Sequence, residues 1–193
     1  MISMRLSPFA PMFFLLLWLV ACSNPKRAST SYYKSSSDKP APVTSAPKKP
    51  TAPATPSTSG GSVSKQRREM ADFARKYIGT PYKYAGASPK TGFDCSGFTS
   101  FILKGYGYPI TPASRGQATL GREVSMSKVQ PGDLVFFAEN GRDVSHVAMV
   151  SKRDGKNVYC IHSTTSRGVV EENITVSKYW QERLLYAKDV IGK

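Results

Sequence analysis

Histidine, cysteine and acidic residues are scarce in this chain of 193 residues. It has two histidines and three cysteines, and its 13 acidic residues stand against 27 basic ones, which gives a formal net charge of +14 at pH 7. Two histidines leave too few ligands for a typical four-coordinate zinc site. We therefore expect no metal site and no other cofactor. The basic excess is typical of a solvated surface rich in lysine, and the alternative is attraction to anionic surfaces.

Long apolar runs are also rare. The one clear run covers residues 9–21 (FAPMFFLLLWLVA) and is shorter than the ~20 residues that a membrane-spanning helix needs. It follows a single basic residue, Arg5, and ends in a small one, which is typical of a secretory signal peptide. We predict that residues 1–21 are this signal. An exported protein has no nucleic acid as a routine partner.

The apolar run ends in LVAC, Leu19–Cys22, which resembles the lipobox of bacterial lipoproteins. The resemblance implies cleavage before Cys22 and acylation of Cys22, so that lipid anchors the mature protein in the cell envelope. Ser23, in place of an acidic residue, favours the outer membrane with the protein facing the periplasm. The alternatives are an ordinary secretory signal with a chance cysteine and an uncleaved membrane anchor, which the short apolar run disfavours.

The segment after the lipobox is poor in large aliphatic residues. Residues 22–64 are rich in Ser, Thr, Pro, Ala and Lys, and such a segment buries too little apolar surface to offset the entropy lost on ordering. We predict a disordered tether. Residues 65–193 remain for one folded domain with one core, which we expect to be a monomer.

The folded part begins with apolar residues at helical spacing. Gly79 and Pro81 end this pattern. The predicted core positions of this helix are Met70, Phe73, Ala74, Tyr77 and Ile78.

A second helical pattern begins at Cys95 and ends near Gly105, with Phe98, Phe101 and Ile102 along one face. Backbone N–H groups and the helix dipole at an N-terminus favour an anion, so the pattern predicts a lowered pKa for the Cys95 thiol. The alternative is a buried cysteine that acts as a small apolar residue. The helix pattern alone leaves both readings open.

Three strands are predicted further along the chain, at Asp133–Phe137, His146–Ser151 and Asn157–Ser163. The second strand contains His146 and the third contains His162, with an Asp-Gly turn signal between them. The two histidines therefore belong to one predicted hairpin.

The register of this hairpin decides whether the histidines meet. A two-residue turn at Asp154–Gly155 would place His162 opposite Val147, with His146 on the other face. A three-residue loop at Arg153–Gly155 would place His146 directly opposite His162. We predict the second register. One imidazole could then accept the thiol proton while the other orients it.

Five short segments, in this order, resemble the NlpC family of bacterial cell-wall cysteine peptidases: YKYAG, GFDCSGF, PGDLVFF, SHVAMV and CIHS. The resemblance covers residues 65–193. It implies an α+β, minimal papain-like fold, in which helices, one of them carrying the cysteine, pack on an antiparallel sheet that carries the histidines. It also implies that Cys95 is the nucleophile, His146 its general base and His162 the residue that orients His146.

The same resemblance implies a substrate: the peptide stems of peptidoglycan, cut between D-glutamate and a diamino acid. It places Tyr84 near the thiol, and Asp94 and Ser96 where the stem's free amino end binds. A helix cap is the alternative role of Asp94. Cys160 is expected to be a buried thiol, with a disulfide to Cys95 as the alternative.

Two other functions stay open beside the peptidase. A catalytically idle module could bind wall peptides on the same scaffold. An amidase or acyltransferase could use the same three residues on a different bond.

Overall fold

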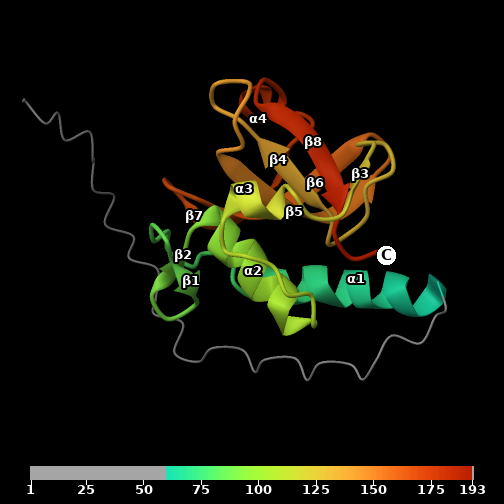
Figure 1. Ribbon diagram of the computed structural model, residues 1–193, viewed down its shortest axis with the longest axis horizontal. Coiled ribbons are helices and arrows are strands. Elements are labelled where there is room, and N and C mark those ends of the chain that lie inside the picture. The colour runs from blue at the N-terminus through green and yellow to red at the C-terminus, as the bar shows by residue number, and fades with distance from the viewer. Residues whose placement is uncertain (1–59, 193) are drawn as a thin grey trace, which may run out of the picture. The chain divides into compact units, whose positions relative to one another are not determined.

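In residues 60–192, which the computed structural model describes, helices pack on an antiparallel sheet (Figure 1). The predicted α+β class is confirmed. The predicted signal peptide (1–21), the lipidation site Cys22 and most of the predicted tether lie outside the described residues.

The main sheet of this part of the chain has six strands in the order β3-β8-β4-β5-β6-β7, and all neighbours are antiparallel. A separate two-stranded sheet, β1-β2, precedes the second helix. The strands are β1 (Ala87–Ser88), β2 (Gly92–Phe93), β3 (Arg122–Val124), β4 (Leu134–Phe137), β5 (His146–Asp154), β6 (Asn157–Thr164), β7 (Gly168–Asn173) and β8 (Leu184–Asp189). The helices are α1 (Gly60–Arg75), α2 (Cys95–Gly105), α3 (Ser114–Gln117) and α4 (Lys178–Gln181).

Helix α1 begins at Gly60, within the segment that the sequence assigned to the tether. Four of its five predicted core positions are buried: Met70, Phe73, Ala74 and Tyr77. The fifth prediction is wrong, because Ile78 is 47% exposed. The helix ends at Arg75, so the chain has already left the helical path when it reaches Ile78.

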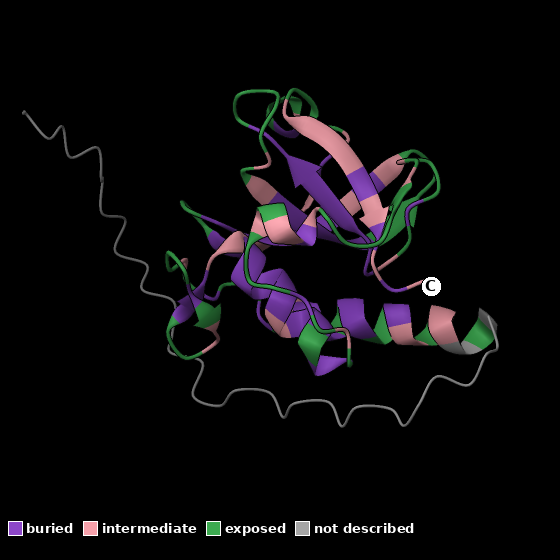
Figure 2. Cartoon of the chain, viewed as in Figure 1, coloured by how far each residue is buried: buried purple, intermediate pink, exposed green. Residues whose placement is uncertain are grey.

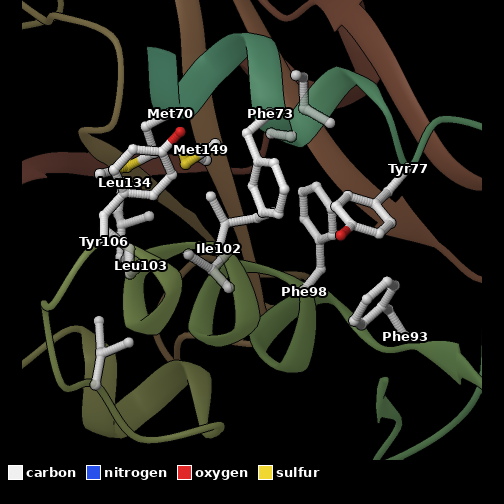
Figure 3. Close-up of a cluster of buried hydrophobic side chains, with 14 of the residues drawn as sticks. Met70, Phe73, Tyr77, Phe93, Phe98, Ile102, Leu103, Tyr106, Leu134 and Met149 are labelled. Atoms are coloured by element: carbon white, nitrogen blue, oxygen red, sulfur yellow. The ribbon is translucent and has the colours of Figure 1, made fainter. Parts of the chain in front are cut away.

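Helix α2 covers the predicted range from Cys95 to Gly105 and packs with α1 on one face of the sheet (Figure 1). Aromatic rings of the two helices meet at this core, for example Phe73 and Phe101 with centroids 6.3 Å apart. Figure 3 shows Phe98 and Ile102 of α2 among the side chains of this cluster. Burial of such side chains stabilises the fold by about 1.5–3 kcal/mol each.

The opposite face of the sheet has its own core. Alternate residues of β4 to β6 point into it, including Phe137, Ala148 and Cys160, and Trp180 of α4 closes it. Cys160 is a free thiol with 0% exposure, as expected. Because both faces are covered, β4 is buried along its whole length (Figure 2).

The three predicted strands are present as β4, β5 and β6, but the predicted register of the hairpin is wrong. Asp154 pairs with Asn157, so the turn contains two residues, Gly155 and Lys156. Gly155 has a φ of 57°, which suits glycine at the first position of a type II′ turn. Directly opposite His162, the register continues to Ala148 rather than to His146.

A β-bulge at Ser151 nevertheless brings both histidines to one face. The pairs Val150–Cys160 and Lys152–Tyr159 leave Ser151 as the extra residue of β5. Without the bulge, the observed turn would place His146 and His162 on opposite faces, because a one-residue slip exchanges faces. With it, they are diagonal neighbours on one face.

The bulge is held from the helix side of the sheet. The Ser151 hydroxyl lies 2.5 Å from Glu171 Oε1 and 3.1 Å from the Tyr159 carbonyl. Arg75 of α1 donates to Glu171 from Nη2 at 2.8 Å. Helix α1 is therefore linked, through Glu171, to the bulge of the histidine hairpin.

Within residues 60–192, no helix has both the length and the apolar character that crossing a membrane requires.

Candidate active site

Cys95 is the first residue of α2, and the residues around it fix this helix start. Asp94 is the N-cap, and its Oδ1 accepts the Gly97 N–H at 2.6 Å. Gly97 permits the close approach of a neighbouring loop: a Cβ at this position would lie 2.0 Å from the Gly86 carbonyl oxygen. The Asp-Cys-Ser-Gly segment thus places the thiol at a helix N-terminus, as predicted.

The predicted lowering of the Cys95 pKa is wrong. Burial raises the pKa of this thiol, and the charge of Asp94 raises it further. Backbone N–H groups of Val147, Ser96 and Cys95 act in the other direction without reversing the effect of burial. The resting side chain is therefore a neutral thiol, next to the backbone that follows His146.

His146 and His162 lie in contact on the face of the sheet opposite α1 and α2. His146 Nε2 is 2.7 Å from His162 Nδ1, and His162 Nε2 is 2.8 Å from Glu172 Oε1. His162 has 0% exposure, whereas His146 is partly exposed. The three side chains form one hydrogen-bonded row from β5 through β6 to β7.

Glu172 ends this row and has further donors. The indole N–H of Trp180 donates to Oε1 at 2.9 Å, and Arg167 Nη2 lies 2.9 and 3.0 Å from the two carboxylate oxygens. The hydrogen bond from His162 and these other donors lower the pKa of Glu172 to about 2. Glu172 is therefore ionised at neutral pH.

Trp180 also packs on both imidazoles. Its ring stacks on His146 with centroids 4.9 Å apart and an interplanar angle of 24°, and it meets His162 edge-on at 4.8 Å. Burial lowers the pKa of His146 to about 3. His146 is thus a neutral base at pH 7.

A cavity of about 590 Å³ joins Cys95 and His146. The cavity wall also includes Tyr82, Glu172 and Trp180. Many of the remaining lining residues carry hydroxyl or guanidinium groups: Ser145, Ser163, Thr164, Thr165, Ser166, Arg167, Ser177, Tyr179 and Arg183. The structure therefore brings Cys95, His146 and, behind them, His162 to one site.

The tyrosine at this site is Tyr82, not Tyr84. Tyr84 is 83% exposed, whereas Tyr82 lines the cavity together with Cys95, and burial raises the pKa of Tyr82. A bridge between Tyr82 and Phe93 holds this segment against the strand before Cys95. The prediction that Tyr84 lies near the thiol is therefore wrong, and Tyr82 takes this place.

Asp94 and Ser96 are engaged within the protein. Besides capping α2, Asp94 lies 3.0 Å from the Ser96 hydroxyl, which is also 3.1 Å from the Pro112 carbonyl. Neither residue lines the cavity. The cap role accounts for the contacts of Asp94.

Comparison with known proteins agrees with this geometry. The model of the NlpC/P60 family matches residues 79–189, which is more than half of the chain. The chain belongs to the NlpC/P60 family. The predicted family is thereby confirmed.

Relatives within the NlpC/P60 family carry peptidase names. The chain is 31% identical over 121 residues to the probable endopeptidase NlpC of Escherichia coli, covering 62% of this chain and 75% of the relative. It is 36% identical to the γ-D-glutamyl-L-lysine dipeptidyl-peptidase of Bacillus cereus, covering 58% of this chain but only 36% of that relative. Family membership and these relatives support a cysteine peptidase.

A solved NlpC/P60 domain shares the fold. The NlpC/p60 domain of the peptidoglycan hydrolase SagA matches with a TM-score of 0.53 and 30% identity, covering 64% of this chain and 97% of that chain.

The prediction of the NlpC/P60 site missed Glu172, Trp180 and Arg167. All three lie on or beside β7 and α4, which the sequence analysis did not predict. The position of Glu172 in the segment GVVEEN (168–173) is the signal that could have found it. Alternate residues of a strand share a face, so Glu172 lies on the same face as Val170, and Val170 pairs with His162.

Proposed function

We propose that this protein is a cysteine peptidase that hydrolyses the peptide stems of peptidoglycan, with Cys95 as nucleophile, His146 as general base and His162 as the residue that orients His146. The observation that carries the proposal is the shared cavity of Cys95 and His146, with the His146–His162 hydrogen bond of 2.7 Å behind it. A nucleophile, a base and an orienting group in this order are the parts that acyl transfer requires.

The first half-reaction begins from a neutral pair, because burial raises the pKa of Cys95 and lowers that of His146. The thiol proton passes to His146 as the sulfur attacks the amide carbonyl. Backbone N–H groups at the start of α2, including that of Cys95, are the candidate donors to the resulting oxyanion. His146 then protonates the leaving amine, and the C–N bond breaks to give a thioester.

Water completes the reaction. His146 takes a proton from the attacking water, hydroxide adds to the thioester carbonyl, and the carbon–sulfur bond breaks. The proton returns to the sulfur, which leaves a free carboxylic acid and the original thiol.

The bond we propose is the amide between γ-D-glutamate and a diamino acid. One relative is named for the γ-D-glutamyl-L-lysine linkage and a structural neighbour is titled a peptidoglycan hydrolase. Of the two arginines that line the cavity, Arg167 binds Glu172, which leaves Arg183 as the candidate partner of a substrate carboxylate.

Digestion of purified peptidoglycan, followed by mass analysis of the released fragments, tests this proposal. The wild-type protein should release fragments cut after γ-D-glutamate, and Cys95→Ala should release none. Cys160→Ala is the matched control, because it removes a free thiol that lies outside the cavity. It should cleave at close to the wild-type rate.

Other outcomes separate the remaining functions. Wild-type protein that binds stems but releases nothing beyond Cys95→Ala would identify an idle binding module. Fragments cut between sugar and peptide would identify an amidase, and peptide transferred to an added amine would identify an acyltransferase.

We propose further that acylated Cys22 anchors the protein in the outer membrane, facing the periplasm. The support is the LVAC segment followed by Ser23. In fractionated cells, Cys22→Ser should move the protein from the membrane to the soluble fraction. Retention of this variant in the membrane would contradict the anchor.

A further inference from the structure

Glu172 is the one carboxylate in hydrogen-bond contact with the histidine pair among the described residues. An ionised carboxylate has acceptors but no proton to donate. His162 must therefore carry a hydrogen on Nε2, the atom 2.8 Å from Glu172 Oε1.

Arg167 and Trp180 keep this assignment from changing. Both donate to the same carboxylate, and Arg167 brings a full positive charge to it. These donors hold the carboxylate in its ionised, accepting form. In a neutral ring with its hydrogen on Nε2, Nδ1 of His162 is an acceptor.

The constraint passes on to His146. Its Nε2 lies 2.7 Å from the accepting Nδ1 of His162, so Nε2 must carry the hydrogen of His146. The remaining nitrogen, Nδ1, then has a free lone pair. Without an acceptor at the far end, each ring could adopt either tautomer, and the opposite order would place a hydrogen on His146 Nδ1.

We propose that Glu172 is a positioning residue that sets the tautomers of both imidazoles and so leaves His146 Nδ1 free to accept the thiol proton. This rests on the proposed function for the role of His146, although the tautomers themselves do not depend on it. Trp180 supports the arrangement, since its N–H binds Glu172 while its ring stacks on His146.

The neighbouring residue provides a matched control. Glu171 points to the other face of the sheet, where it binds Arg75 and Ser151 and contacts neither histidine. A Glu-to-Gln substitution at either position removes one charge from the same strand.

Rates of stem-peptide hydrolysis test the proposal. Gln at position 172 keeps the size of the side chain but offers both a donor and an acceptor, so it no longer selects one tautomer. We expect Glu172→Gln to lower kcat by about 10²–10⁴-fold. The lower end is the usual loss when a residue that orients an active-site side chain is removed, and the upper end is the loss when a catalytic histidine is held in the wrong tautomer. KM should change by less than about threefold, and Glu171→Gln should lower kcat by less than about fivefold.

A merely structural role makes a different prediction. The isosteric Glu172→Gln would then restore the kcat lost in Glu172→Ala. That result, or an equal loss of kcat in Glu171→Gln, would overturn the proposal.

Alkylation of Cys95 by iodoacetamide gives a readout that needs no peptidase activity. In the full-length protein, the mass of the Cys95-containing peptide distinguishes it from the peptides of the other two cysteines. We expect Glu172→Gln to slow this alkylation by about tenfold and Glu171→Gln to leave it near the wild-type rate. Equal rates in all three proteins would overturn the inference. Slowed alkylation in a protein that cleaves no stem peptide would overturn the proposed function alone.

Discussion

Glu171 and Glu172 are neighbours in β7, but their carboxylates lie on opposite faces of the sheet. Glu171 faces α1, where it binds Arg75 and the bulge residue Ser151. Glu172 faces the other way, where it binds His162 and Trp180. One carboxylate therefore links helix α1 to the bulge, and the other binds side chains of the candidate site.

Two adjacent acidic residues of one strand can therefore have separate roles, because the side chains of a strand alternate between the two faces of the sheet. Substitutions on the α1 side should act mainly on stability. Substitutions in the row that ends at Glu172 should act mainly on the reaction.

Among the four substitutions compared below, His146→Gln, Arg75→Ala, Arg68→Ala and Ser151→Ala, the change at the proposed base should have the largest effect. We expect His146→Gln to lower kcat by about 10³-fold, in the range that general base catalysis contributes. Its melting temperature should stay close to that of the wild type, since Gln is polar and His146 is partly exposed. Steady-state kinetics and thermal unfolding check both parts. A variant that retains wild-type kcat would remove His146 from the mechanism.

Loss of the ion pair between Arg75 and Glu171 should lower the stability of the fold. Arg75→Ala removes the cation that binds Glu171, with Arg75 Nη2 2.8 Å from Oε1. We expect a loss of about 2 kcal/mol in the free energy of unfolding, as for a hydrogen bond to a charged group. Urea unfolding measures it.

Arg68→Ala is the control for that helix. Arg68 also belongs to α1, but it is exposed and makes an exposed side-chain hydrogen bond to Ser64. This variant should lose less than about 0.5 kcal/mol, as most surface substitutions do. An equal loss in the free energy of unfolding in both variants would mean that the contact between Arg75 and Glu171 does not stabilise the fold.

The low pKa of Glu172 should affect how the stability of the fold depends on pH under acidic conditions. Its pKa in the folded protein is about 2, below the ordinary value of 4.5, so the carboxylate stabilises the fold above pH 4.5. That contribution is lost as the pH falls from 4.5 towards 2. In chemical unfolding across this range, Glu172→Gln should show a shallower decline than the wild type. Parallel declines would contradict the assigned environment.

Apart from the control Arg68→Ala, the smallest effect should follow from Ser151→Ala. This change removes one hydroxyl from the bulge while Arg75 still holds Glu171. We expect a loss of about 1 kcal/mol in the free energy of unfolding and little change in kcat. A large loss of kcat would mean that the hydroxyl itself, rather than the backbone, sets the register.

The helix that carries Cys95 could be predicted from sequence because its signals are local. Asp94 caps α2 and Gly105 ends it within one short segment. The pKa of Cys95 could not, since the burial that raises it comes from elements distant in sequence.

The prediction that His146 and His162 share a face of the hairpin is confirmed, although the predicted register is wrong. The true turn shifts the pairing by three residues from the predicted one and the bulge shifts it back by one, so the histidines still share a face. The Ser151 hydroxyl in the bulge contacts Glu171, twenty positions further along the chain. No local pattern in the hairpin contains that contact.

The remaining members of the row are also products of tertiary structure. Glu172 and Trp180 reach the histidines only because β7 pairs with β6 and α4 folds over the same face. The motifs that resemble the NlpC family predicted Cys95, His146 and His162 but included neither residue.

The most direct test of the central claim uses the fact that the chain has only two histidines. With ¹⁵N-labelled histidine, the four ring nitrogens can be followed by NMR at pH 7 in the wild-type protein. We predict that each ring carries hydrogen on Nε2 and none on Nδ1. A hydrogen on Nδ1 of His146, in either a neutral or a charged ring, would contradict the account.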